Sequence, residues 1–195
     1  MKKLLLASTL LLSVGAVEAA QSIRWDSATL SYISVDLSGN HLTGVGVEAT
    51  KLVSKNIIVS ANYGAVSDDI TLLGSTVKVD LDTLSVGVGF RHPYSKNTDF
   101  FGIVSYEEME FNASYQNNFD AESDNGYGLQ AGVRTLINER IELSGSINYI
   151  DLDEESEVGF DLSTMYHVSE RFSASFGYSK YDEVDAIFLS AILFF

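Results

Sequence analysis

Apolar residues alternate with small or polar residues along most of the chain. In residues 57–63, for example, every second side chain is Ile, Val, Ala or Tyr, and Ser and Asn occur between them. A period of two places successive side chains on opposite faces of a β-strand, so the alternation predicts strands. The predicted strands cover residues 27–37, 42–52, 57–66, 79–91, 99–111, 125–136, 141–151, 157–167, 172–181 and 185–195.

Four short polar tetrapeptides separate pairs of these strands. They occupy residues 53–56, 94–97, 137–140 and 168–171. Each is followed by an alternating run that ends in a tyrosine, and an acidic segment of variable length comes before the next alternating run. Short turns on one side and longer loops on the other are typical of a transmembrane barrel, with its turns in the periplasm and its loops outside.

The two phases of the alternation differ in volume. One phase is aliphatic with aromatic residues at its ends, which suits contact with lipid. The other phase is small and polar, too poor in volume to form a dry core. Backbone groups inside a bilayer must all be hydrogen-bonded, so the sheet has to close on itself. The sequence therefore predicts an all-β fold, a closed antiparallel up-and-down transmembrane β-barrel with ten strands, or alternatively eight.

Aromatic residues recur at matching offsets in the predicted hairpins. The predicted outer girdle consists of Tyr63, Tyr106, Tyr149 and Tyr178. The predicted inner girdle consists of Phe90, Phe100, Tyr166 and Phe172. Aromatic belts mark both membrane interfaces, although aromatic residues also favour strands in general.

The N-terminus has the layout of a secretory signal peptide. Lys2 and Lys3 precede an apolar run of 11 residues at 4–14, which is too short for a membrane-spanning helix of roughly 20 residues. Small residues follow, and cleavage is expected after Ala19 or Ala20.

This layout predicts a signal peptide at 1–19 and one barrel domain at 20–195. Without Lys2, Lys3 and Glu18 the chain keeps 10 basic and 26 acidic residues, a net charge of −16. Such a chain is a poor partner for nucleic acid. It contains no cysteine, which excludes a disulfide framework.

The last predicted strand, residues 187–195, ends in phenylalanine and resembles the assembly signal of outer-membrane barrels. Its apolar phase comprises Ile187, Leu189, Ala191, Leu193 and Phe195. With its glycine-rich strands at 84–90 and 126–133, the mature chain resembles the small outer-membrane β-barrel family that includes OmpX and the transmembrane domain of OmpA. Most of those relatives have eight strands, whereas this sequence predicts ten.

The resemblance implies a porin-like barrel, a monomer in the outer membrane of a Gram-negative bacterium. It also implies contact with outer-membrane lipid and lipopolysaccharide. Periplasmic chaperones and the barrel-assembly machinery are the partners that it implies during biogenesis. It does not carry over a wall-tethering role, since no peptidoglycan-binding segment is expected.

Five ionisable residues fall in the small, polar phase and are predicted to point into the lumen. They are Glu48, Arg91, Arg134, Glu142 and Asp161. An unpaired charge in a confined interior is costly, so opposite charges should pair and form a structural plug. The alternative hypothesis is a gate or selectivity ring in a narrow channel.

The predicted loop side is strongly acidic. It carries 19 acidic residues and two lysines, Lys78 and Lys180. The acids are Asp36, Asp68, Asp69, Asp80, Asp82, Glu107, Glu108, Glu110, Asp120, Glu122, Asp124, Asp151, Asp153, Glu154, Glu155, Glu157, Asp182, Glu183 and Asp185. A solvated surface explains them, and the alternative is loosely bound calcium or magnesium shared with lipopolysaccharide. The candidate ligands are Asp151, Asp153, Glu154 and Glu155, without the spacing of an EF-hand. No other cofactor is predicted.

Histidine and aspartate residues allow a comparison with barrel enzymes. Omptin proteases have a site of Asp and His residues at the extracellular rim. This chain resembles them in residue type, because His41, Asp68 and Asp69 are predicted at the same rim. The first loop is too short to wall a cleft, and His92 and His167 are predicted to be turn or interface residues. A lipid-modifying enzyme would also need a histidine at the outer rim, and His41 is the only candidate for that role. The sequence thus predicts a non-catalytic protein with a structural or surface-interaction role, or alternatively a narrow cation-preferring channel.

Overall fold

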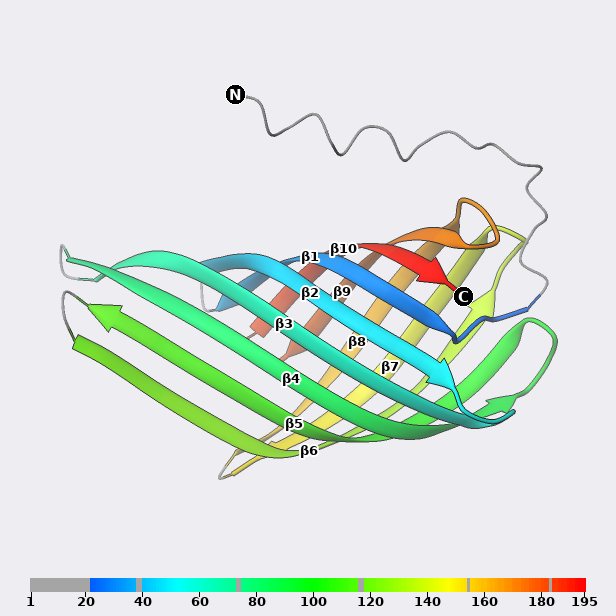
Figure 1. The fold of residues 1–195 in the computed structure, drawn as a ribbon, viewed down its shortest axis with the longest axis horizontal. Coiled ribbons are helices and arrows are strands. Elements are labelled where there is room, and N and C mark those ends of the chain that lie inside the picture. Colours follow the sequence, from blue (N-terminus) through cyan, green and yellow to red (C-terminus); the bar gives the residue numbers. More distant parts are fainter. Residues whose placement is uncertain (1–21, 38–39, 73–74, 116–117, 154, 183) are drawn as a thin grey trace.

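The computed structural model describes residues 22–37, 40–72, 75–115, 118–153, 155–182 and 184–195. Within them the chain forms ten antiparallel strands that close into a barrel (Figure 1). The strands are β1 (Ser27–Leu37), β2 (Asn40–Leu52), β3 (Ile57–Leu72), β4 (Ser75–Pro93), β5 (Thr98–Tyr115), β6 (Asn118–Leu136), β7 (Ile141–Leu152), β8 (Glu155–His167), β9 (Phe172–Tyr181) and β10 (Val184–Phe194). The predicted fold class is confirmed, with ten strands and not eight.

Each strand pairs with its neighbour in sequence, and β1 pairs with β10 to close the sheet. The closing register runs from Ser27 opposite Phe194 to Leu37 opposite Val184. No helix of the described residues is long and apolar enough to cross a membrane. The predicted signal peptide at 1–19 lies outside the described residues and stays a prediction.

All four predicted tetrapeptide turns lie at one end of the barrel, called the turn end below. They share one backbone hydrogen bond, illustrated by the amide of Val53, which donates to the carbonyl of Ile57 at 3.0 Å. The second residue of the turn adds a side-chain acceptor: Ser54 Oγ accepts from the Ile57 amide at 3.2 Å. Asn138 Oδ1 accepts in the same way from the Ile141 amide at 2.9 Å. A short polar side chain at this position therefore explains the recurring sequence.

The opposite end, called the loop end, differs from the prediction. Residues 67–78 and 112–124 were expected to be long loops, but residues 67–72 and 75–78 continue β3 and β4, and residues 112–115 and 118–124 continue β5 and β6. These four strands reach farther than their neighbours (Figure 1). The physical reason is cross-strand pairing along two hairpins, which extends to Leu72 opposite Ser75 in the first one.

The outward face carries the apolar phase of the alternation. Ile147, for example, is 66 % exposed on β7, whereas Ser146 beside it is buried. Other exposed apolar residues include Leu30, Val47, Val88, Val104, Leu129, Val158, Leu162 and Phe176. The predicted assembly segment has the same geometry, because Ile187, Leu189, Leu193 and Phe195 are exposed.

The interior is less uniformly small and polar than predicted. An apolar cluster fills the turn end, formed by Ile23, Trp25, Ile58 and Leu136. A second cluster at the loop end contains Val35, Leu42, Val66 and Val79. The first cluster arises because the segment before β1 brings a tryptophan against the barrel wall. Between the two clusters the inward residues are glycines and small polar residues together with larger apolar side chains such as Ile103 and Phe188, which lie against Gly87 and Gly177.

Two glycines allow close approach of strands near the loop end. A Cβ on Gly44 would overlap the carbonyl oxygen of Ala65, and one on Gly126 would overlap that of Asp151. Gly126 lies opposite Leu152 in the last residue pair between β6 and β7. Toward the loop end, β6 continues beyond this pair without β7 as its partner. Glycine is required at these positions because any side chain would push the strands apart.

Candidate functional site

A layer of polar and aromatic side chains crosses the lumen at the turn end. The indole Nε1 of Trp25 donates a hydrogen bond to Asp99 at 2.8 Å, and the Trp25 ring meets the edge of Phe101 at 5.4 Å between centroids. The Arg134 guanidinium lies 4.5 Å from the Trp25 ring centroid, a cation–π geometry. Trp25 thus lies between an acid, an aromatic ring and an arginine.

Ion pairs complete this turn-end layer. Arg134 Nε lies 2.6 Å from Glu142 Oε1, and Arg91 lies 3.2 Å from Asp99. His167 Nε2 faces the second oxygen of Glu142 at 3.3 Å. The side chains of His167 and Glu142 are 5 % and 1 % exposed, so both are shielded from solvent.

The five predicted lumen residues all lie in the inward phase, but their contacts differ. Arg134 and Glu142 pair with each other, whereas Arg91 pairs with Asp99, a residue that sequence reasoning missed. Glu48 accepts a hydrogen bond from Thr50 Oγ1 at 3.0 Å, and Asp161 contacts only neutral side chains.

Two further residues correct the sequence prediction. His167 was expected at a turn or interface but is buried in the lumen, where its Nδ1 lies 2.8 Å from Ser173 Oγ. Glu107 was assigned to the acidic loops but its carboxylate accepts from Ser85 at 2.9 Å and from Ser105 inside the barrel. Inward placement follows from strand parity, which puts both side chains in the polar phase.

The aromatic residues predicted to form girdles all lie on the outward face. On the side of the turn end, Phe90, Phe100, Tyr166 and Phe172 are exposed. Toward the loop end lie Tyr63, Tyr106, Tyr149 and Tyr178, with Tyr127 as an additional member that is 6.1 Å from Tyr149 between ring centroids. Their function as membrane girdles stays a prediction.

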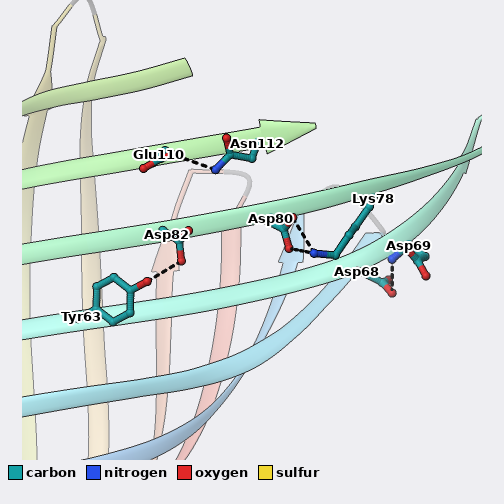
Figure 2. A network of polar contacts seen from close by, with 8 residues as sticks. All are labelled: Tyr63, Asp68, Asp69, Lys78, Asp80, Asp82, Glu110 and Asn112. Atoms are coloured by element: carbon teal, nitrogen blue, oxygen red, sulfur yellow. Dashed lines mark hydrogen bonds and ion pairs between the residues drawn. The ribbon is translucent and has the colours of Figure 1, made fainter. Parts of the chain in front are cut away.

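Tyrosine hydroxyls on this face point at carboxylates placed toward the loop end. Tyr63 donates to Asp82 at 2.9 Å, as Figure 2 shows, and Tyr149 donates to Asp151 at 2.7 Å. The same contact joins Tyr106 to Glu108 at 3.3 Å and Tyr178 to Asp185. We call Asp82, Glu108, Asp151 and Asp185 the rim carboxylates.

Beyond the rim carboxylates, the hairpin of β3 and β4 carries further acids. Lys78 donates to Asp80 at 2.7 Å and is the basic residue of this hairpin extension (Figure 2). Its hydrogen bonds to Asp80 raise the pKa of Lys78 above its ordinary value. The ion pair is exposed and adds little stability.

The candidate cation ligands are dispersed. Asp151 accepts from tyrosines, and Asp153 forms an exposed turn with a positive φ of 44°. Glu154 and the side chain of Glu155 lie outside the described residues. In the described part of the chain, no three His, Cys, Asp or Glu side chains converge on a metal site.

The candidate enzyme residues contact different partners. The amide of Asp69 donates to Asp68 Oδ1 at 2.8 Å, and His41 meets Asp36. His41 Nδ1 lies 3.3 Å from Asp36 Oδ2 at the loop end, and the His41 side chain is 68 % exposed. Catalysis by a histidine base requires a positioned proton donor in a protected site. This exposed pair provides no such pocket.

The sequence matches a family profile described as "Outer membrane protein beta-barrel domain" over residues 4–179. No curated protein shows significant sequence similarity to the chain.

Several solved structures resemble the barrel at low sequence identity. The NanC porin is 12 % identical, with a TM-score of 0.52 over 85 % of this chain and 99 % of NanC. Ail, the attachment invasion locus protein of Yersinia pestis, is also 12 % identical, with a TM-score of 0.42 over 87 % of this chain and 97 % of Ail. The N-terminal β-barrel domain of Pseudomonas aeruginosa OprF is 8 % identical, with a TM-score of 0.46 over 87 % and 98 % of the two chains. The likeness to NanC concerns the fold alone.

Proposed function

This chain belongs to the outer-membrane β-barrel family and is an outer-membrane protein, and from that premise we propose a non-catalytic, non-conducting role in the cell envelope. In such barrels the short turns face the periplasm, so the turn end faces the periplasm and the loop end faces the medium. The protein then acts through its outer rim, as a structural partner of the lipopolysaccharide leaflet.

The observation that carries this proposal is the set of rim carboxylates. Each accepts a hydrogen bond from an outward tyrosine, so each is held at the level where an interfacial aromatic residue sits. Lipopolysaccharide presents anionic groups at the same level. Carboxylates and phosphates repel unless a divalent cation lies between them, and Mg²⁺ and Ca²⁺ prefer such oxygen ligands. Shared cations would tie the barrel to the leaflet.

The long hairpins support a surface role. The described side chains of the β3–β6 extensions include many acids, with Lys78 as their basic residue. These acids are Asp68, Asp69, Asp80, Asp82, Glu108, Glu110, Glu122 and Asp124. A surface of this charge repels anionic molecules and stays hydrated.

Removal of divalent cations from the protein in lipopolysaccharide vesicles tests this role. The melting temperature should fall when EDTA replaces Mg²⁺, because the bridges to the leaflet are lost. The double variant Asp82→Asn, Asp151→Asn should lose most of that dependence. A matched control, Glu139→Gln with Glu170→Gln, removes two charges at the turn end and should keep it. Equal Mg²⁺ dependence in the rim variant and the wild type would contradict the proposal.

A second candidate function is a narrow cation-preferring channel. The specific observation is that Glu48, Glu107 and Asp161 line the lumen without a basic partner among the described residues. Against conduction stands the turn-end layer, in which Trp25 packs with Ile58, Leu136 and Phe101 beside paired polar side chains of β4 to β8.

Planar-bilayer recording separates the two functions. The wild type should show no conductance steps. Trp25→Ala should produce steps whose reversal potential indicates a preference for cations. Regular cation-selective steps from the wild type would establish the channel and overturn the non-conducting role.

A further inference from the structure

A polar cluster lies inside the barrel between the two apolar clusters, on the wall formed by β7, β8 and β9. Asp161 is at its centre. Its carboxylate accepts hydrogen bonds from Asn148 Nδ2 at 2.6 Å and from Ser146 Oγ at 3.2 Å. Ser179 Oγ on β9 donates to the other oxygen. Both carboxylate oxygens therefore face the interior of the barrel.

No basic residue neutralises this carboxylate. Within the described ranges, no Lys, Arg or His lies at ion-pair distance from Asp161, since both lumen arginines are paired with other acids at the turn end. Glu107, also inside the barrel, is held only by the hydroxyls of Ser85 and Ser105. Both carboxylates are half-buried, and a negative charge without a counter-ion in a confined interior is costly.

Asn148 provides an independent indication of a ligand. Its side chain is buried, at 5 % exposure, and its amide Nδ2 is committed to Asp161. The amide oxygen Oδ1 is also buried and accepts no hydrogen bond. Because Oδ1 and Nδ2 share one carbon, this unpartnered acceptor lies beside the Asp161 carboxylate. Buried acceptors without a partner are rare and call for an explanation.

The side chain of Tyr181 adds another oxygen to the cluster. Its ring lies over Gly159, two residues before Asp161 on β8, and the charges of Asp161 and Glu107 act on its phenol. Two carboxylates, an amide oxygen and a phenol thus share one region of the lumen, and all of these groups carry oxygen.

We propose that this cluster binds a hard cation in the lumen, with Asp161 and Asn148 Oδ1 as its ligands and Glu107 as a second negative charge nearby. Carboxylate and carbonyl oxygens suit alkali and alkaline-earth ions, whereas zinc prefers nitrogen and sulfur. The proposal is independent of the rim carboxylates, which lie on the outer face of the barrel.

Thermal unfolding of the refolded full-length mature protein in zwitterionic detergent, without lipopolysaccharide, tests the site. Separate titrations use sodium, potassium, calcium and magnesium chlorides, each compared with choline chloride at equal ionic strength. At least one small cation should raise the melting temperature in a saturable way, because binding to the folded state alone stabilises it. The four titrations identify which cation the site binds.

Three variants make the result specific. Asp161→Asn should abolish the cation-dependent shift, whatever its own stability, and Asn148→Asp should lower the half-saturating concentration at least tenfold. Glu139→Gln removes one negative charge from an exposed turn and should leave the shift unchanged.

Two results would overturn the proposal. One is a wild-type melting temperature that is the same in choline and in every small cation. The other is a shift that survives in Asp161→Asn or disappears in Glu139→Gln.

Discussion

The Glu142→Gln variant tests whether the turn-end layer stabilises the barrel. Glu142 has two partners, Arg134 at 2.6 Å and His167 at 3.3 Å, and its side chain is 1 % exposed. Glutamine keeps the volume and one acceptor oxygen, so no cavity forms. What is lost is the negative charge opposite a guanidinium that is itself only 13 % exposed.

The expected loss follows from that burial. Breaking a buried ion pair from one side costs about 3–5 kcal/mol, and the retained acceptor oxygen places Glu142→Gln near roughly 3 kcal/mol. This corresponds to about a hundredfold change in the unfolding equilibrium. Lys51→Gln is the matched control, because the Lys51–Asp26 pair is 3.5 Å long and Lys51 is 55 % exposed. That exposed pair should contribute about 1 kcal/mol or less.

Urea unfolding in phospholipid vesicles measures both variants. Trp25 is the single tryptophan of the chain and lies against Arg134, so its fluorescence reports on the turn-end layer itself. Far-UV circular dichroism follows the strands in parallel. If Glu142→Gln proves as stable as Lys51→Gln, the burial argument is refuted.

Three further substitutions test other parts of the barrel. Trp25→Phe removes the hydrogen bond to Asp99 and should cost about 1–3 kcal/mol, measured by circular dichroism in urea. Ile147→Arg places a charge on the outward face and should cost about 2–4 kcal/mol in vesicles, whereas a neutral effect would show that Ile147 does not meet lipid. Gly126→Ala adds a Cβ against the carbonyl of Asp151 and should cost about 1–3 kcal/mol in the same urea titration.

The strands and turns were predictable because their signals are local. The alternation at residues 57–63 assigns each side chain to a face without knowledge of the partner strand. Ser54 and Asn138 mark turns because their side chains bond to backbone amides within three residues. The ten-strand count followed from these two signals.

The length of the hairpins was not predictable from the same signals. Residues 67–72 and 75–78 include acids that are typical of loops, and their strand conformation depends on pairing between β3 and β4. Asp68 and Asp69 are exposed on this extension, where water solvates them. The acidic residues therefore indicated solvent exposure correctly, but they wrongly indicated a loop where the structure has strands.

The turn-end layer was predictable only in part. Strand parity alone places Asp99 and His167 inward, so that signal was present in the sequence and was missed. Trp25 precedes the first strand, and no local pattern indicates that it packs inside the barrel. The choice of Asp99 as the partner of Arg91 depends on the register of β4 against β5.

The central claim is that apolar side chains face lipid while small and polar ones face the lumen, and cysteine scanning of β7 tests it most directly. The chain has no native cysteine, so single cysteines at residues 143–148 can each carry a fluorophore in phospholipid vesicles. Brominated lipid should quench the label at Leu143, Gly145 and Ile147 and spare it at Ser144 and Ser146. Quenching without a period of two, or with the opposite phase, would contradict the account.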